Sequence, residues 1–490
     1  MTRQKAWLTY GLAVSMAAFH LYAGYFGQPE AQVFRATHVG FAMSLAFLLF
    51  PCSRGLERRA PARSAALDLG LVALVAALHV YILRDPQGLW LRTGQLTTLD
   101  LTVATLYLLV LLEATRRAVG LAMLAVAGFF IVNAIYGDWF PWIFYGPPHQ
   151  WRVVANALFL GDDGVFGIPV AASAGYIVLF LIFGQLLQKS RALDFFMSLA
   201  LTLTGQQVGG PAKAAVVVSA FEGTYTGSAV ANVVGSGTFT IPLMKRLGYP
   251  AHFAGAVEAV ASSGGQIMPP VMGVTAFVLA EIVGVAYWKV AIAALVPAIL
   301  YFLSVYLMVH FEARRLGLRA IPREDRPHLW PALREGGHLL LPLGFVFWLL
   351  SEGYSVGYAA TWGIAAVFGL SFVSARTRLR PRDVVEALEE MIITGGLNVY
   401  PAEVERVLYM HPAVQEAAVV GSPDPEWGEA VKAFVQLRPG HHTSAADLIE
   451  HCRTHMASYK KPRAVEFLAE LPRTTSGKIA RQALTRRAAR

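Results

Sequence analysis

Two glycine-rich segments near the middle of the chain carry the residue types that bind small ions. They read GTYTGSAVANVVGSGTFTIP at 223–242 and SSGGQIMPP at 262–270. Both are crowded with small and hydroxyl-bearing residues, and the second ends in two prolines. Backbone that leaves helical geometry inside a membrane exposes carbonyl groups that coordinate cations and amide groups that hold anions. Close helix packing through small residues is the alternative, but two interrupted segments exceed what packing requires.

A second chemical candidate lies near the end of the chain, in LPRTTSGKIARQALTRR at 471–487. The compact charge of Lys478 could offset negative charge that develops on a phosphate or a carboxylate. The stretch TSGK at 475–478 lacks the G-x-x-x-x-G-K-[ST] spacing of a phosphate-binding loop. The alternative for Lys478 is a solvated lysine at the start of a helix, without a partner.

Three potential metal ligands, His451, Cys452 and His455, fall within one turn of a predicted helix. No further ligand motif accompanies them, so an ordinary helix face is favoured and no metal is expected. Cys52 and Cys452 fall in different halves of the chain, which makes a disulfide between them improbable.

The composition changes near residue 390, which separates two kinds of structure. Residues 391–490 hold 23 charged side chains, against 50 in the 390 residues before them. Hydrophobic residues make up 55% of the chain, and the mean hydropathy is +0.48. The net charge of +9 does not indicate nucleic acid, because much of the arginine lies in short loops beside apolar runs. We therefore predict an all-α polytopic membrane protein followed by a small α+β domain.

The first 390 residues contain runs that are long and apolar enough to cross a lipid bilayer. These lie at 7–26, 33–51, 65–83, 97–115, 119–136, 168–187, 287–309, 338–351 and 356–375. Basic residues follow the second, fourth and sixth runs, and more lie at 312–336 and 376–382. Lys and Arg in short loops mark the cytoplasmic side, so both termini are predicted to be cytoplasmic. The first run is too long for the core of a cleaved signal peptide and is expected to be retained.

Residues 137–165 lie on the predicted opposite side and are rich in Trp, Phe and Pro, with Asp138, Asp162 and Asp163 among them. Aromatic side chains are typical of the membrane interface, which is the favoured interpretation. The alternative is a docking surface for an external partner.

Three runs within residues 1–390 resemble the permease of a tripartite ATP-independent periplasmic (TRAP) transporter. They lie at 166–190, 209–250 and 255–287. The resemblance is to the type that fuses the small and large subunits and works with TAXI-class binding proteins. It implies a bacterial inner-membrane protein, embedded in lipid, in which sodium entry drives the uptake of small organic acids. It also divides this part into small-subunit-like helices at 1–150 and a large-subunit-like region at 151–390.

The same resemblance implies which residues contact sodium and the substrate, through carbonyl and hydroxyl groups. In the first re-entrant hairpin they are Thr226, Ser228 and Asn232, and in the first broken helix they are Ser262, Ser263, Gly264 and Gly265. A second repeat is expected after LRPRDVVEALEE (379–390), but no later run is long enough to span a membrane. Because inverted-repeat carriers bind between their repeats, we expect a permease truncated after its first repeat to bind weakly.

The last hundred residues predict an α+β domain. Helices are expected at PAEVERVLYM, with Val404, Val407 and Leu408 on one face, at DLIEHCRTHM and at GKIARQALTRR; strands are expected at AVQEAAVVG, EAVKAFVQL and VEFLA. Residues 391–490 resemble the C-terminal lid domain of acyl-CoA synthetases, through MIITGGLNVYPAEVERVL, HPAVQEAAVVGSPDPEWGEAVKAFV, YKKP and LPRTTSGKI. The resemblance implies that Lys478 assists adenylation and that Thr394, Gly395 and Gly396 face the pantetheine of coenzyme A.

The large N-terminal domain of these synthetases, which holds the phosphate loop and the acyl pocket, has no counterpart here, so we do not expect an enzyme. The first hypothesis is a sodium-coupled permease component, with sodium as the coupling ion and no organic cofactor. The second is a lid that works in trans with a separate synthetase. The third is a chimeric membrane-tethered scaffold without either activity.

Overall fold

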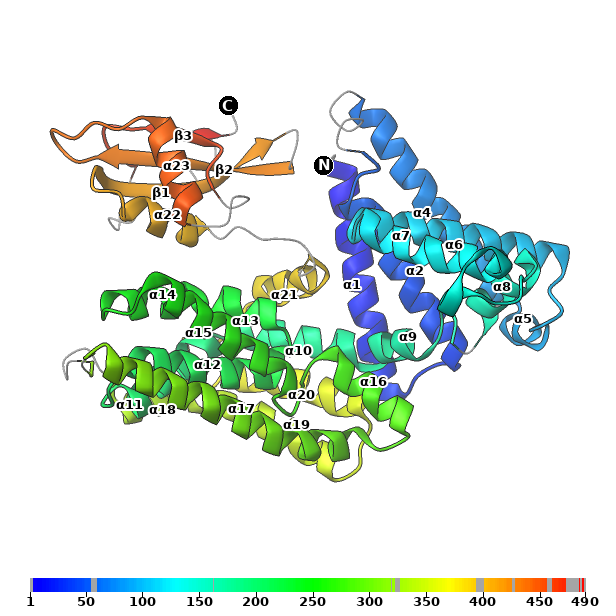
Figure 1. The fold of residues 1–490 in the computed structure, drawn as a ribbon, viewed down its shortest axis with the longest axis horizontal. Helices are drawn as coiled ribbons and strands as arrows, with labels where there is room; N and C mark the ends of the chain where they lie inside the picture. Colours follow the sequence, from blue (N-terminus) through cyan, green and yellow to red (C-terminus); the bar gives the residue numbers. More distant parts are fainter. Residues whose placement is uncertain are drawn as a thin grey trace. The chain divides into compact units, whose positions relative to one another are not determined.

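The computed structural model describes residues 3–53, 60–161, 163–318, 320–321, 327–393, 401–424, 428–455 and 461–472, with 484 and 487–488. The chain divides into two compact units (Figure 1). One comprises Ala6–Phe50 and Asp68–Ile393, and the other comprises Met1–Lys5, Pro51–Leu67 and Thr394–Arg490. We call them the helical unit and the C-terminal unit.

The first part of the helical unit is built of membrane-length helices joined by short connections. Its elements are α1 (Arg3–Phe26), α2 (Ala31–Leu49), α4 (Pro61–Arg84), α5 (Pro86–Leu91), α6 (Thr98–Ala118), α7 (Leu121–Ile135), the 3₁₀ turns η1 (Gly137–Trp139) and η2 (Trp142–Phe144), and α8 (Trp151–Leu160). Figure 1 draws them in blue and cyan.

The second part contains shorter helices in its middle. They are α9 (Ile168–Ala172), the short π-helix η3 (Ser173–Ile177), α10 (Val178–Lys189), α11 (Ala192–Thr204), α12 (Gly210–Thr226), α13 (Ala229–Gly235), α14 (Gly237–Arg246), α15 (Ala251–Gly264), the 3₁₀ turn η4 (Gly265–Ile267) and α16 (Val274–Val283). Then follow α17 (Tyr287–Arg315), α18 (Leu329–Gly336), η6 (Gly337–Leu339), α19 (Leu340–Ser351), α20 (Val356–Ser371) and α21 (Pro381–Ile393).

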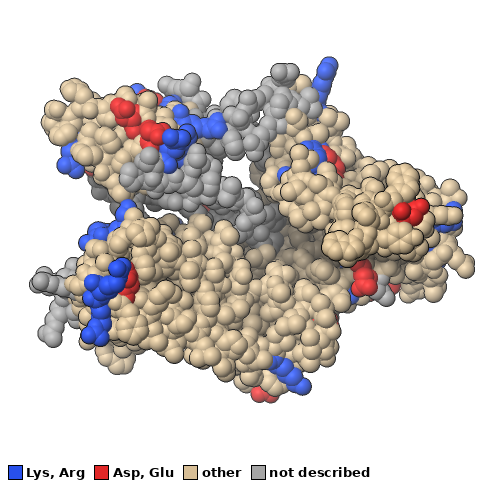
Figure 2. Space-filling model, viewed as in Figure 1, with Lys and Arg blue, Asp and Glu red and all other residues tan. Residues whose placement is uncertain are grey.

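Within the described residues, five helical segments have the length and composition to cross a membrane. They are Ala31–Leu49, Ala62–Arg84, Thr98–Ala118, Ile168–Lys189 and Tyr287–Arg315. Large hydrophobic side chains are exposed along several of them, such as Val296 at 62% and Leu300 at 59%. Figure 2 shows broad areas of this unit without Lys, Arg, Asp or Glu. The predicted class, a helical polytopic membrane protein, is confirmed.

Helix α12 is buried on nearly all sides, which explains its composition. Its Lys213, Ser219 and Glu222 are buried together with its small residues. A helix without an exposed polar face belongs in the interior of a bundle, and small side chains allow its neighbours to approach closely. Helices α11, α15 and α17 pack around α12.

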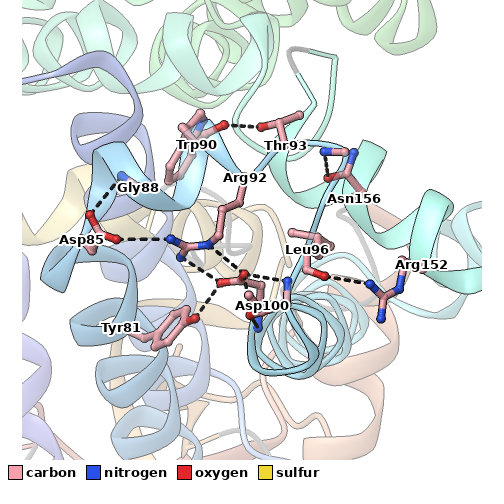
Figure 3. A network of polar contacts seen from close by, with 12 residues as sticks. Tyr81, Asp85, Gly88, Trp90, Arg92, Thr93, Leu96, Asp100, Arg152 and Asn156 are labelled. Atoms are coloured by element: carbon pink, nitrogen blue, oxygen red, sulfur yellow. Dashed lines mark hydrogen bonds and ion pairs between the residues drawn. The ribbon is translucent and has the colours of Figure 1, made fainter.

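Two buried carboxylates, Asp68 and Asp100, connect α4 and α6 at two points along the helices. At one, Arg117 Nη1 lies 2.6 Å from the Asp68 carboxylate, and the two side chains are 1% and 0% exposed. At the other, the buried Asp100 carboxylate accepts hydrogen bonds from Tyr81 Oη at 2.6 Å and from Arg92 Nε at 2.9 Å. Figure 3 shows this second network. These pairs set the register of the two helices, since a buried charge needs its partner.

The C-terminal unit contains a three-stranded sheet with helices. Strand β1 (Val414–Asp424) pairs antiparallel with β2 (Gly428–Leu437), and β2 pairs parallel with β3 (Ala464–Phe467). Helices α22 (Pro401–Tyr409) and α23 (Ala445–His455) complete it. The predicted strands and these two helices are confirmed, and Val404, Val407 and Leu408 are buried as expected. Most of the predicted last helix lies outside the described residues.

The three potential metal ligands of α23 do not form a ligand set in the described structure. His451 contacts the Val407 carbonyl at 3.1 Å through Nε2. Cys452 is fully buried, and burial raises the pKa of its thiol to about 11. Nothing is described of the His455 side chain. Among the described residues, no group of three or more His, Cys, Asp or Glu could hold a metal.

We predict that Arg117→Met destabilises the helical unit far more than Arg116→Met. The first change removes a buried arginine that forms ion pairs with both Asp68 and Glu113, and breaking a buried ion pair costs about 3–5 kcal/mol. The second removes a partly exposed ion pair with Glu113, worth about 1 kcal/mol or less. Thermal unfolding of the purified full-length chain in detergent compares the two midpoints. Equal midpoints would show that the Asp68 contact does not hold α4 to α6.

Candidate functional site

The first glycine-rich segment forms a hairpin. Helix α12 ends at Thr226, and the chain reverses at Gly227, whose φ is +58°. A Cβ at this position would overlap the Met272 carbonyl oxygen, so only glycine fits. After the turn α13 runs back beside α12, which places Asn232 against Thr226. The Thr226 hydroxyl donates to Asn232 Oδ1 at 2.5 Å.

The second segment is a broken helix. Helix α15 tightens into η4 and ends at Ile267, and α16 begins at Val274. Between them the chain is held by hydrogen bonds outside any helix. The Tyr287 hydroxyl lies 2.8 Å from the Pro270 carbonyl oxygen and 2.7 Å from that of Val271. The Gly273 amide donates to the Gln266 carbonyl at 2.7 Å. The predicted hairpin and broken helix are both present.

The hairpin and the break touch each other. The Val271 amide donates to the Thr224 carbonyl at 3.3 Å. The backbones of Gly223 and Gly265 lie so close that a Cβ at either position would strike the other residue. A Cβ on Gly265 would also meet Asn232 Nδ2. Glycine is needed here for close backbone approach, which sequence composition indicated without identifying the contact.

The predicted site residues divide into those that meet and those that do not. Thr226, Asn232 and Gly265 come together where the two breaks touch. Ser228 caps α13, since its hydroxyl accepts from the Ala231 amide at 3.3 Å. Ser263 is exposed and bonds its own helix at the Ala259 carbonyl.

The remaining two predicted residues have other neighbours. Gly264 packs against the rings of Tyr301 and Phe302. Ser262 is buried, and its hydroxyl donates to Glu258 at 3.3 Å. Glu258 is one of two buried carboxylates that the sequence analysis did not identify.

Two buried carboxylates lie beside the hairpin. Glu258 is 0% exposed and Glu222 is 2% exposed. Ser236 Oγ donates to Glu258 Oε1 at 2.7 Å, and Thr240 donates to Glu258 Oε2. Glu222 lies close to the same turn, since a Cβ on Gly235, the residue before Ser236, would meet Glu222 Oε1. Ionisable residues within membrane helices mark ion or substrate pathways by default, so the acids in FEGT and VEAV could have been singled out.

The polar atoms of this cluster are not all satisfied within the protein. Glu222 Oε2 and Asn232 Nδ2 are buried without a hydrogen-bond partner. Within the described part of the chain, no Lys, Arg or His forms an ion pair with Glu222 or Glu258. A buried carboxylate without a positive partner is costly unless it is protonated or binds a cation. The arrangement can therefore hold a cation among carboxylate, hydroxyl and amide oxygens.

A family match agrees with this geometry. Residues 106–400, more than half of the chain, match the tripartite ATP-independent periplasmic transporter, DctM component. The chain belongs to this family. It is a multi-pass membrane protein and a TRAP-type permease component, and the DctM-matched region contains the hairpin, the broken helix and both buried acids.

A second match covers residues 403–478, which resemble the AMP-binding enzyme C-terminal domain. In a separate comparison, this chain is 49% identical over 104 residues to a feruloyl-CoA synthase of Amycolatopsis sp, covering 21% of each chain. It is 46% identical over 101 residues to a long-chain-fatty-acid–CoA ligase of Bacillus subtilis (strain 168), covering 21% of this chain and 18% of the relative. The DctM-family chain thus spans about a fifth of the length of these relatives.

A solved structure shows the same limited overlap. A Brucella canis acyl-CoA synthetase is 47% identical, over 18% of this chain and 17% of its own, with a TM-score of 0.18. Lys478 and the segment Thr394, Gly395 and Gly396 lie outside the described residues, so their predicted roles remain predictions.

The aromatic loop of the DctM-family chain is strongly exposed. Trp139, Trp142 and Tyr145 are 74%, 90% and 70% exposed. Asp162 lies outside the described residues. This exposure suits both interpretations of the loop, a membrane interface and a docking surface.

We predict that Gly227→Ala disrupts the hairpin while Gly255→Ala does not. A side chain at 227 overlaps the Met272 carbonyl and is strained at positive φ. Gly255 lies within α15 with open space around its Cα, so alanine there is tolerated. Thermal midpoints of the two purified variants should differ by several degrees, about 1–3 kcal/mol. A Gly227→Ala protein as stable as Gly255→Ala would contradict the close contact.

Proposed function

We propose that this chain is the membrane permease component of a sodium-coupled TRAP-type transporter for small organic acids. The observation that carries the proposal is the pair of buried carboxylates, Glu222 and Glu258, beside two touching breaks in the helices. In water such acids would be solvated, but here a bound cation would balance their charge. An inward sodium gradient would then supply the energy for uptake.

The residues that would hold sodium are oxygen donors already grouped by the fold. Glu222, Glu258 and the Ser236 hydroxyl lie together, and Asn232 Oδ1 is beside Thr226. Asn232 Nδ2 is a buried donor without a partner among the described residues, so it is suited to donate a hydrogen bond to the carboxylate of a substrate. Neutralising the two acids first would make the approach of an anion favourable, which couples cation and substrate binding.

Delivery and orientation complete the proposal. The substrate would arrive with a TAXI-class periplasmic binding protein, and the protein would lie in a bacterial inner membrane with both termini in the cytoplasm. The described region contains one hairpin and one broken helix, whereas inverted-repeat carriers bind their substrate between two such sets. We therefore expect weaker binding of the organic acid than in a carrier with both repeats.

Sodium should stabilise the purified full-length chain, and Glu258→Gln should remove this effect. At a sodium concentration of 100 times Kd the gain is about 2.7 kcal/mol. The measurement is the thermal midpoint in NaCl compared with choline chloride at equal ionic strength. Glu281→Gln is the matched control, because Glu281 is exposed on α16 and should keep the sodium response.

Equal midpoints in both salts would contradict the sodium site. A midpoint that follows pH instead of sodium would assign the coupling ion as a proton. Uptake into proteoliposomes, with the binding protein outside and a sodium gradient directed inward, tests transport itself. Absence of uptake by a normally inserted protein would contradict an intact transport function.

A second candidate function rests on residues 403–478. Their identity of 46–49% to acyl-CoA ligases and a core of their own, around Val404, Leu408 and Val435, support a lid domain that acts in trans. Lys478 would contact the acyl carboxylate and phosphate of a separate synthetase body, and Thr394–Gly396 would approach coenzyme A. If neither function operates, the chain remains a membrane-tethered scaffold.

A fragment of residues 391–490 should restore adenylate formation when it is mixed with a synthetase that lacks its own lid. Pyrophosphate release measures the reaction, and circular dichroism verifies that the fragment is folded. Lys478→Ala should abolish the gain, because the positive charge at the phosphate is lost. An unchanged rate with the folded wild-type fragment would exclude the function in trans.

A further inference from the structure

A large basic cavity lies at one end of the helical unit, away from any role assigned above. It has a volume of about 1190 Å³ and lies between the end of α10, the end of α20 and the start of α21. Its wall carries one acidic residue, Asp383, and five basic ones. The basic residues are Lys189, Arg191, Arg376, Arg378 and Arg380.

Only part of this positive charge is balanced within the protein. Lys189 Nζ lies 3.3 Å from Glu386, and Arg376 pairs with Glu335. The Asp383 carboxylate accepts from the backbone amide of Arg380 at 2.8 Å and so caps α21. Among the residues that the structure describes, the guanidinium groups of Arg191, Arg378 and Arg380 have no carboxylate partner.

The cavity wall is also apolar, and its apolar side continues onto the surface. Phe368, Phe372, Leu379 and Val384 line it. Phe368 and Phe372 are 45% and 49% exposed, and the adjacent Val373 is 65% exposed. The Arg378 guanidinium lies 5.3 Å from the centre of the Phe372 ring, so the charged and apolar surfaces meet at this residue.

We propose that this cavity binds an anionic phospholipid, with its phosphate at Arg378 and Arg380 and its acyl chain along α20. Arginine recognises phosphate oxygens with two parallel donors. A free phosphate would need only the basic residues, whereas the exposed aromatic wall of α20 fits a hydrocarbon chain. Basic pockets between membrane helices on the cytoplasmic side are known to hold acidic headgroups, and loop charge predicts that this end is cytoplasmic.

The lipid would also have a structural consequence. It would bridge α20 and α21, which both pack against α10. It would also screen Arg191, Arg378 and Arg380 from one another. Binding to the folded protein stabilises it by mass action. The site therefore predicts that acidic lipid raises the thermal stability of the protein.

The test is the thermal midpoint of the full-length chain in dodecyl maltoside, titrated with one of three ligands. Dioctanoyl phosphatidylglycerol should raise the midpoint in a saturable manner. Dioctanoyl phosphatidylcholine tests for a general lipid effect, and glycerol 3-phosphate tests for the free headgroup. Neither control ligand should raise the midpoint over the same concentration range.

Substitutions test whether the lipid binds at Arg378 and Arg380. Arg378→Gln/Arg380→Gln should weaken the phosphatidylglycerol response by about tenfold to thirtyfold, since each basic residue near an acidic headgroup contributes about tenfold or less. The matched control is Arg314→Gln/Arg315→Gln, two exposed arginines at the end of α17, which should change it less than about twofold. Arg378→Lys/Arg380→Lys keeps the charge but loses the two parallel donors, so its response should lie between those of the wild type and Arg378→Gln/Arg380→Gln.

Phe372→Ala separates the lipid from a free phosphate. It should weaken the response to phosphatidylglycerol, because it removes part of the apolar wall. An equal midpoint rise with glycerol 3-phosphate would replace the lipid with a small phosphate ligand and overturn the proposal. An equal loss in both arginine pairs, or a wild-type response in Arg378→Gln/Arg380→Gln, would overturn it as well.

Discussion

The close contact between two interrupted helices is the constraint on which the rest of this permease depends. Where Gly223 meets Gly265 and Gly227 meets the Met272 carbonyl, there is no room for side chains. Backbone groups freed from helical bonding must find other partners, because lipid offers none. The Tyr287 hydroxyl is within hydrogen-bond distance of the carbonyl groups of Pro270 and Val271, so neighbouring protein groups hold the break.

This contact brings polar groups into the interior that a simple helical bundle would exclude. Asn232 and Glu222 are buried with unsatisfied atoms, and Glu258 is buried with hydroxyl partners. A bundle that tolerates such groups gives up stability for them. In the function proposed here, these unsatisfied donors and acceptors would contact the ion and the anionic substrate.

Elsewhere in the helical unit, buried charged side chains lie beside side chains of opposite charge. The Arg117–Asp68 pair connects α6 to α4, and the Arg92–Asp100 pair connects the end of α5 to α6. The basic cavity at α10, α20 and α21 differs from both arrangements, because its arginines exceed the nearby carboxylates. Among the described residues, the buried charge pair thus connects helices, whereas the arginines without a carboxylate partner are the ones proposed to meet a ligand.

The sequence by itself determined the classes of structure and the places where helices break. Apolar run length predicts helices, and the glycine-rich segment at 223–242 and the Pro269–Pro270 pair predict where they break, because both act on the local backbone. The runs AVQEAAVVG and EAVKAFVQL likewise predict two strands, which β1 and β2 confirm.

Only the tertiary structure decided which side chains meet. Composition could not tell that Ser263 faces outward while Ser262 contacts Glu258, since the two residues are adjacent and chemically identical. It also did not reveal that Glu222 and Glu258, thirty-six positions apart, lie beside the consecutive residues Gly235 and Ser236. That contact depends on the turn at Gly227 and on the packing of α13 and α14 against α15, which are long-range events that no local pattern encodes.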